Sequence, residues 1–461
     1  MEMTKRKKFV QYGAGNIGRG FIGQLFSEAG YEVVFIDVDP VVVEALNREH
    51  RYPVRIVSRE GYAETWVEPV SAVDGRDIAA VIEAIATADM MATAVGANIL
   101  PRIAGPLAKG FQLRWANGVT RPLDILICEN LMDANHYLAD LVRRELPEEQ
   151  HALFSERVGL VEASIGRMVP VMTPEQKADN PLRVCVEAYK TLPVDKDAFR
   201  GSVPPLATIE PSSPFRFHLE RKLYLHNMGH AMTAYLGYLR GCTFLYEAIS
   251  MADIRLFVQS AMTDAARSLA MRHEKPLEPL LAHVDDLLYR FGNPALGDTI
   301  FRVGRDPVRK LAAGDRLEGA ARLCLSQGIF PSWLCVGIAA AFLFNPGEDA
   351  AAMDLQRELA QQGLENGLEN GLQNVLQNRC GIDPDEPLGR SVVECFSLLQ
   401  QGSSLDGLHM LRGESPSSHC KCARTCIDSV IDSAHSLGRL IGLAEEEKRM
   451  QFKSTTREEL V

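Results

Sequence analysis

The stretch Gly13-Ala-Gly-Asn-Ile-Gly18 decides the fold class of the first part of the chain. A short apolar run from Lys8 to Tyr12 precedes it, and a second strand pattern from Glu32 to Ile36 follows and ends at Asp37. Strand, glycine turn, helix, strand and acid in this order are typical of a dinucleotide-binding βαβ unit. The first glycine permits the tight turn, the second lets backbone approach a pyrophosphate, and the third lets the helix pack on the strand. The stretch therefore predicts a Rossmann-type domain.

Asp37 indicates which dinucleotide would bind. A carboxylate at this strand end can accept hydrogen bonds from both ribose hydroxyls and would repel a 2′-phosphate. No arginine follows it directly, so NAD is favoured over NADP. Asp39 could compete for this role, but its place before Pro40 favours a turn or cap residue. The expected cofactor contacts are Gly13, Ala14, Gly15, Asn16, Ile17, Gly18, Asp37, Thr93, Val95 and Glu129.

Strand patterns recur after this unit, at 54–57, 90–95 and 123–128, with helical patterns between them. Such alternation predicts a largely parallel sheet, and ligands bind where the strands of such a sheet end. Asn130 follows one of these ends, where it could be a helix cap, a turn residue or a ligand contact. The residues alone leave these roles open.

A proline- and serine-rich passage at 204–214 suggests a connection, and helical patterns dominate after it. The expected fold class is α/β, with a doubly wound Rossmann-type sheet followed by a mainly α-helical domain. We assign residues 1–200 to the NAD-binding domain and 201–401 to the helical substrate domain. Residues 402–461 form an extra tail, expected to be disordered or to dock as a helix.

The stretch Arg221-Lys-Leu-Tyr-Leu-His-Asn-Met-Gly-His230 carries the candidate chemistry. On an α-helix Lys222, Asn227 and His230 would share a face roughly 140° wide. A lysine near an apolar wall has a lowered pKa and can act as a general base. An asparagine can donate to an oxygen that gains charge, and a histidine can position a hydroxyl. The alternative reading is a solvated lysine and a structural histidine.

A second candidate site is the basic run within 301–310, which stands out in an otherwise acidic protein. Its cations could bind an anion, or they could be helix-end charges paired with acids. The residues concerned are Arg302, Arg305, Arg309 and Lys310.

Composition limits the function class. The chain has 461 residues and a formal charge of -11, which disfavours non-specific binding to nucleic acid or anionic membrane. Its longest strongly apolar run, 333–344, is too short to span a bilayer and suggests a buried helix. The N-terminus lacks the apolar core of a signal peptide. Seven of the ten cysteines are scattered singly, which fits reduced thiols better than a disulfide framework. We therefore expect a cytoplasmic protein, monomeric or homodimeric.

With these motifs in view, the chain resembles the polyol-specific long-chain dehydrogenases, the mannitol dehydrogenase family, over roughly residues 8–400. The resemblance rests on 13–23, Cys128-Glu-Asn130, 220–231, 302–311 and 313–317. It implies a Rossmann-type domain, a mainly helical domain, and metal-independent NAD chemistry on a sugar alcohol bound between them.

The resemblance also implies roles for single residues. Lys222 would take the hydroxyl proton, Asn227 and Asn130 would hold the oxygen that develops charge, and His230 would orient the substrate. Arg302 and Lys310 match basic substrate-contacting positions, and Arg305 and Arg309 are plausible additions for a phosphate. No convincing set of zinc ligands occurs in the first 400 residues.

Three features depart from the family pattern. Gly166-Arg167 stands where the family usually has an Asp-Arg pair, so one substrate contact could be absent or replaced. The four-residue repeat at 363–378 suggests a marginal helix or surface insertion, because its glycines disfavour a helix. The tail carries His419-Cys-Lys-Cys-Ala-Arg-Thr-Cys426, whose spacing matches no standard zinc pattern.

The leading hypothesis is an NAD-dependent dehydrogenase that interconverts mannitol 1-phosphate and fructose 6-phosphate, a small-molecule sugar-phosphate substrate. A close alternative acts on an unphosphorylated hexitol or a hexuronate. An alternative of another class is an NAD-responsive binding or regulatory module with the tail as its contact surface.

Overall fold

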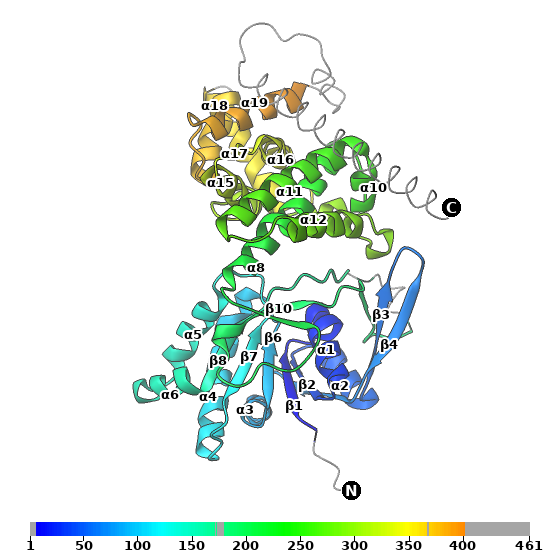
Figure 1. Cartoon of the computed structure of the whole chain (residues 1–461), viewed down its shortest axis with the longest axis vertical. Coiled ribbons are helices and arrows are strands. Elements are labelled where there is room, and N and C mark those ends of the chain that lie inside the picture. The colour runs from blue at the N-terminus through cyan, green and yellow to red at the C-terminus, as the bar shows by residue number, and fades with distance from the viewer. Residues whose placement is uncertain (1–5, 171, 173–178, 367, 402–461) are drawn as a thin grey trace, which may run out of the picture.

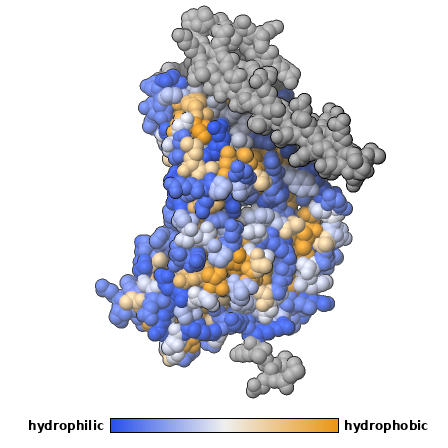
Figure 2. All heavy atoms as spheres, in the orientation of Figure 1, coloured by the Kyte–Doolittle hydropathy of each residue, from blue (hydrophilic) through white to orange (hydrophobic). Residues whose placement is uncertain are grey.

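The fold has two parts, an α/β part that contains the N-terminus and a helical part (Figure 1). It was obtained as a computed structural model that describes residues 6–170, 172, 179–366 and 368–401. The predicted cysteine cluster at 419–426 lies outside the described residues. On the face shown in Figure 2, hydrophilic residues cover most of the surface and hydrophobic residues gather in separate patches.

A six-stranded parallel sheet forms the centre of the α/β part. Its spatial order is β5 (Val70–Asp74), β2 (Glu32–Asp37), β1 (Lys8–Tyr12), β6 (Met90–Thr93), β7 (Leu123–Ile127), β8 (Val158–Glu162). This order reverses direction at β1, and the carboxyl ends of β1 and β6 flank the point of reversal, where open α/β sheets bind ligands. The predicted Rossmann-type sheet is therefore confirmed.

Helices cover both faces of this sheet, as its buried strands require. One face packs on α3 (Ile78–Ala86), α4 (Leu100–Ala116) and α5 (Ala134–Glu145). The other packs on η1 (Gly18–Gly23), α1 (Gln24–Glu28) and α2 (Pro40–Glu49). Asp39 caps α2 by accepting from the Val41 N–H at 2.9 Å, which confirms the predicted cap.

The strand predicted at 54–57 belongs to a different sheet. β3 (Tyr52–Val57) pairs antiparallel with β4 (Tyr62–Val67) and parallel with β9 (Val184–Val186). The third strand along the chain in the parallel sheet is β5, which the sequence reading missed. The connection at 58–61 is short enough for β3 to pair locally with the next strand as a hairpin. The hairpin reaches the helical part through Arg59, which donates to the Tyr289 carbonyl at 2.9 Å.

The helix α6 (His151–Arg157) and the short strands β10 (Leu192–Asp195) and β11 (Ile209–Ser212) complete the α/β part.

One continuous helical run opens the helical part, formed by α8 (Arg216–Arg221), the π-helix η5 (Lys222–Asn227) and α9 (Met228–Leu239). Around α9 lie α10 (Leu245–Ser250), α11 (Ala252–Arg272), α12 (Glu278–Phe291), α13 (Ile300–Gly304), α14 (Pro307–Leu311), α15 (Glu318–Ser326), α16 (Ser332–Phe342), α17 (Ala350–Asn366), α18 (Leu368–Val375), η7 (Leu376–Cys380) and α19 (Pro387–Gln401). Together they enclose one hydrophobic core, in which α16 is the predicted buried helix.

The four-residue repeat at 363–378 is helical in its described residues, within α17, α18 and η7. Leu372 and Leu376 are fully buried in the helical core, so packing offsets the low helix propensity of the glycines here. No helix in the described ranges has the length and apolar character needed to cross a bilayer.

Candidate active site

The glycine turn sits between the carboxyl ends of β1 and β6, and each of its glycines has a different environment. Gly13 has φ of +94°, and a Cβ there would lie 2.5 Å from the Ala94 carbonyl oxygen. A Cβ on Gly18 would lie 2.0 Å from the Gly13 carbonyl oxygen, so this position also requires glycine. Gly15 has nothing within 4 Å of an added Cβ. The backbone there is open to a ligand, which fits a pyrophosphate at the start of the helix that begins at Asn16.

Two side chains hold this turn in shape. The Ala14 N–H donates to the Asp37 carboxylate at 2.6 Å, which places the acid at the mouth of the turn. Buried Arg19 donates to the Ala14 carbonyl and, across the domain, to the Leu182 carbonyl, both at 2.6 Å. Its burial lowers the pKa of the guanidinium. Arg19 was missed by the sequence reading.

The site residues predicted at the strand ends, and Ile17 of the turn, have different surroundings. Glu129 is buried and accepts from the backbone N–H groups of Val95 at 3.0 Å and Gly96 at 2.8 Å, so it shapes the loop after β6. Thr93 is fully buried, and its hydroxyl has no hydrogen-bond partner among the described residues. Asn130 is exposed at the end of the β7 segment. Ile17 packs on the hydrophobic core beneath the turn.

Lys222 begins the π-helix η5, in which the Met228 N–H donates to the Leu223 carbonyl five residues back. A π-helix places residues five apart about one turn from each other, so Lys222 and Asn227 share a side more closely than on an α-helix. Lys222 lines a pocket with residues of both parts of the chain: Ser164, Gly166, Tyr189, Pro193, Arg221, His226 and His283.

The surroundings of Lys222 destabilise its ammonium form relative to that of a free lysine. Burial and the nearby Arg316 guanidinium lower its pKa to about 8, and Cys128 at the end of the β7 segment opposes this shift. The interaction with Cys128 also places the amine near the carboxyl end of the parallel sheet. A lysine with this pKa can exchange a proton near neutral pH.

His230 lies about two turns beyond Lys222 in the same helical run, where Asp298 fixes its orientation. Its Nε2 lies 3.1 Å from Asp298 Oδ2. Burial, and then the cations Arg302, Arg316, Lys310 and Arg290, lower the His230 pKa to about 3. The neutral ring therefore donates from Nε2 to the acceptor Asp298, which leaves Nδ1 able to accept a hydrogen bond from a hydroxyl. Asp298 was not predicted from the sequence.

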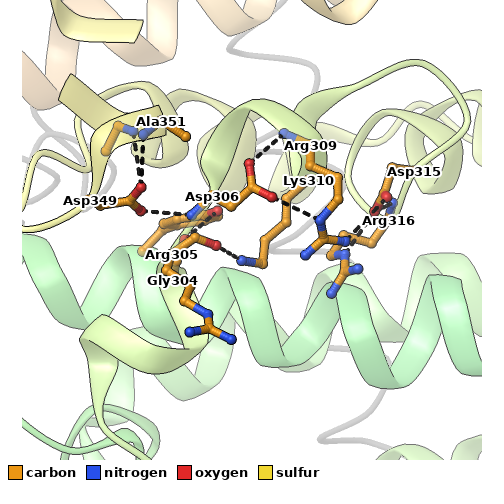
Figure 3. A network of polar contacts seen from close by, with 11 residues as sticks. Gly304, Arg305, Asp306, Arg309, Lys310, Asp315, Arg316, Asp349 and Ala351 are labelled. Carbon is orange, nitrogen blue, oxygen red and sulfur yellow. Dashed lines mark hydrogen bonds and ion pairs between the residues drawn. The ribbon is translucent and has the colours of Figure 1, made fainter. Parts of the chain in front are cut away.

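In the basic segment at 302–310 two arginines pair with carboxylates and the lysine donates to a backbone carbonyl; Figure 3 shows the contacts around Asp306. Arg302 forms an ion pair with Asp298, and Arg309 lies 3.0 Å from Asp306. Buried Lys310 donates to the Arg305 carbonyl, and burial followed by the Arg316 charge lowers its pKa to about 7.

Arg305 and Arg316 differ in exposure. The Arg305 guanidinium is exposed and points away from this network (Figure 3). Arg316 is buried, lies 2.7 Å from Asp315, and affects the pKa of Lys222, His230 and Lys310 alike. In the sequence, the Gly-Asp-Arg turn at 314–316 was the feature that could have drawn attention to Arg316 as a site residue.

Gly166 lines the same pocket as Lys222, and its carbonyl accepts from Arg290 at 2.5 Å. A Cβ at this position would lie 3.1 Å from the Tyr189 ring. Tyr189 thus fills the space beside Gly166. No three His, Cys, Asp or Glu side chains in the described part of the chain gather as a metal-binding group.

Comparison with known proteins agrees with this arrangement. Residues 7–208 match the mannitol dehydrogenase Rossmann domain, and residues 215–385 match the mannitol dehydrogenase C-terminal domain. The mannitol-1-phosphate 5-dehydrogenase of Brevibacillus brevis is 40% identical over 394 residues, which cover 86% of this chain and 98% of that protein.

Two solved structures share the fold at low sequence identity. The mannitol 2-dehydrogenase of Pseudomonas fluorescens, in a ternary complex with NAD and D-mannitol, has a TM-score of 0.71 at 15% identity, covering 89% of this chain and 95% of that one. A substrate-free D-sorbitol dehydrogenase has a TM-score of 0.68 at 15% identity, covering 86% and 93%. The chain belongs to the mannitol dehydrogenase family and is an NAD-dependent polyol dehydrogenase.

Proposed function

We propose that the protein interconverts D-mannitol 1-phosphate and D-fructose 6-phosphate, with Lys222 as the general base. The observation that carries the proposal is the Lys222 amine, whose pKa is lowered to about 8 where it lines a pocket between the two parts of the chain. The choice of a phosphorylated substrate is supported by the name of the Brevibacillus brevis relative.

In the oxidation, the neutral Lys222 amine accepts the proton of the reacting hydroxyl and becomes an ammonium. Asn227 and Asn130 donate to the same oxygen, and so stabilise the negative charge that it gains. The His230 Nδ1 accepts from a neighbouring hydroxyl and fixes the substrate's rotation, because Asp298 holds the ring. In the reduction, the Lys222 ammonium returns the proton.

NAD supplies the hydride acceptor when it is bound. We propose that the turn from Gly13 to Gly18 holds its pyrophosphate and that Asp37 accepts from its ribose hydroxyls. Glu129 would act through the loop at Val95 and Gly96, whose N–H groups it holds. Thr93 would support this loop from beneath the surface.

Substrate identity is tested by following NADH absorbance with the purified protein and matched substrates. We expect turnover of fructose 6-phosphate with a kcat/KM at least about 100-fold above that for fructose, because a charge-assisted phosphate contact contributes a few kcal/mol. Tagaturonate and fructuronate serve as hexuronate controls. Faster reduction of free fructose or a hexuronate would assign the protein to the alternative substrates.

The role of Lys222 is tested with Lys222→Met, which keeps the length of the side chain but cannot accept a proton. We expect kcat to fall about 1,000-fold, within the range that general acid–base catalysis supplies, while the Kd for NADH stays within about threefold. The matched control is Lys196→Met, an exposed lysine that does not line the pocket. Retained turnover in Lys222→Met would show that a group other than Lys222 is the base.

A further inference from the structure

We propose that the phosphate group of the substrate binds to Arg221, His283 and Tyr189 in the pocket beside Lys222, rather than to Arg305 and Arg309. The inference rests on the proposed function, since it requires a phosphorylated substrate. It concerns where the charged end of that substrate lies.

The positive charges of the arginines in the 302–310 segment are either paired with carboxylates or screened by solvent. Arg302 is paired with Asp298, and Arg309 lies between Asp306 at 3.0 Å and Asp315 at 3.7 Å. A dianion here would lie among these carboxylates, which would repel it. Arg305 is exposed, so water and salt would screen its contact with a phosphate.

The pocket beside Lys222 has the opposite balance. Its described lining residues include one arginine, one lysine and two histidines, and no carboxylate. The Arg221 guanidinium forms no hydrogen bond or ion pair with any described residue, and it lies 5.6 Å from the centre of the Phe217 ring. The aromatic ring supports the guanidinium without neutralising its charge. Arg221 is therefore a cation available to an anionic ligand.

Neutral donors accompany this charge. Arg221 interacts electrostatically with the Tyr189 hydroxyl and with His283. Burial, then Arg221 and Arg290, lower the pKa of His283 to about 3, so the free pocket holds an uncharged imidazole in a positive field. A phosphate dianion would relieve this unfavourable field and accept hydrogen bonds from the ring and the hydroxyl.

Glu187 and Glu210 lie near the pocket but leave its charge in place. Glu210 interacts electrostatically with Tyr189, but it is exposed, so solvent screens its charge. Glu187 is buried and accepts hydrogen bonds from the Arg290 Nε at 2.8 Å and from the Met168 N–H. Its negative charge is therefore neutralised by Arg290. Gly166 adds neither volume nor charge. An aspartate there would meet Tyr189 and would place a negative charge in the pocket. The glycine thus keeps the pocket suited to an anion.

The test compares fructose 6-phosphate with fructose in Arg221→Met and in the control Lys275→Met. Lys275 is exposed and contacts the same Phe217 ring at 5.8 Å, but it does not line the pocket. We expect Arg221→Met to raise the KM for fructose 6-phosphate about 30- to 100-fold, with kcat/KM for fructose changed less than about threefold. Lys275→Met should leave both substrates unaffected, and Arg221→Lys should recover part of the loss.

Inorganic phosphate gives a second readout that needs no turnover of the variant. With NADH saturating, so that the glycine turn is already occupied, it should protect the wild-type protein against thermal unfolding, and this protection should disappear in Arg221→Met and in Gly166→Asp. Protection that persists in both variants would overturn the inference.

Failure of this inference is distinguishable from failure of the proposed function. A wild-type protein that reduces fructose as well as fructose 6-phosphate overturns the proposed function and the inference together. A wild type that prefers fructose 6-phosphate, with Arg221→Met affecting both substrates equally, overturns only the inference. So does a phosphate-selective loss in Arg305→Ala or Arg309→Ala instead of Arg221→Met.

Discussion

Protonation of the Lys222 amine sets the expected pH dependence of catalysis. The pKa of this amine is lowered to about 8, first by burial and then by Arg316. Below this pKa the ammonium cannot accept a proton, so kcat/KM for alcohol oxidation should rise as pH increases through it. Ketone reduction needs the ammonium, and its kcat/KM should fall over the same interval.

Arg316→Met tests the electrostatic part of this shift. Removing the guanidinium relieves its repulsion of the ammonium, so the midpoint of the oxidation profile should move to higher pH. Lys196→Met is the control and should leave the midpoint in place. A profile unchanged in Arg316→Met would contradict an electrostatic contribution of Arg316 to the Lys222 pKa.

Candidate site residues could be predicted from the sequence where a local motif brings them together. The turn glycines and the Lys222, Asn227 and His230 spacing are such cases. Asp298 and Arg316 come from distant positions and meet these residues only through packing of the helical part, so spacing could not reveal them. The Gly166 carbonyl and Arg290 meet in the same way, 124 residues apart in sequence.

Among the elements, the glycine turn offers a paired test of folding against cofactor binding. Gly18→Ala would force a Cβ to within 2.0 Å of the Gly13 carbonyl oxygen, so we expect the turn to shift at a cost of about 1–3 kcal/mol in unfolding free energy. Gly15→Ala meets nothing within 4 Å and should leave the melting temperature nearly unchanged. Its new methyl group would occupy the open face of the turn, so the Kd for NADH should rise about tenfold.

Thermal unfolding and NADH titration of the two variants measure these effects. Equal loss of stability in both would contradict the assignment of separate roles.

Element type and order were largely predictable because hydrophobic periodicity is local. Sheet membership was less predictable: β3 has a strand pattern like those of the parallel sheet, yet it pairs with β4 in the hairpin. The π-helix at 222–227 was also missed, since an i, i+5 backbone register leaves no periodic signature over one turn.

At the scale of the whole molecule, a buried ion pair joins the two parts. Arg290 of α12 lies 2.5 Å from Glu187, and both side chains are buried. Arg290→Met would leave Glu187 uncompensated, and we expect it to lower the unfolding free energy by about 3–5 kcal/mol. Adding Glu187→Met should recover much of this loss, but the Met168 N–H would then lack its acceptor.

Denaturant unfolding of the single and double variants measures this coupling. Arg59→Ala, at the exposed hairpin contact with α12, is the control and should cost less than about 1 kcal/mol. A double variant no more stable than Arg290→Met would contradict the coupling.

The pocket around Lys222 has a wall from each part of the chain, with Ser164, Gly166 and Tyr189 on one side and Arg221 and His283 on the other. The amine loses its hydration only while both walls are present. A chain whose halves had separated would therefore carry an ordinary, strongly basic ammonium at this position. A base suited to neutral pH therefore requires that both parts of the chain are docked.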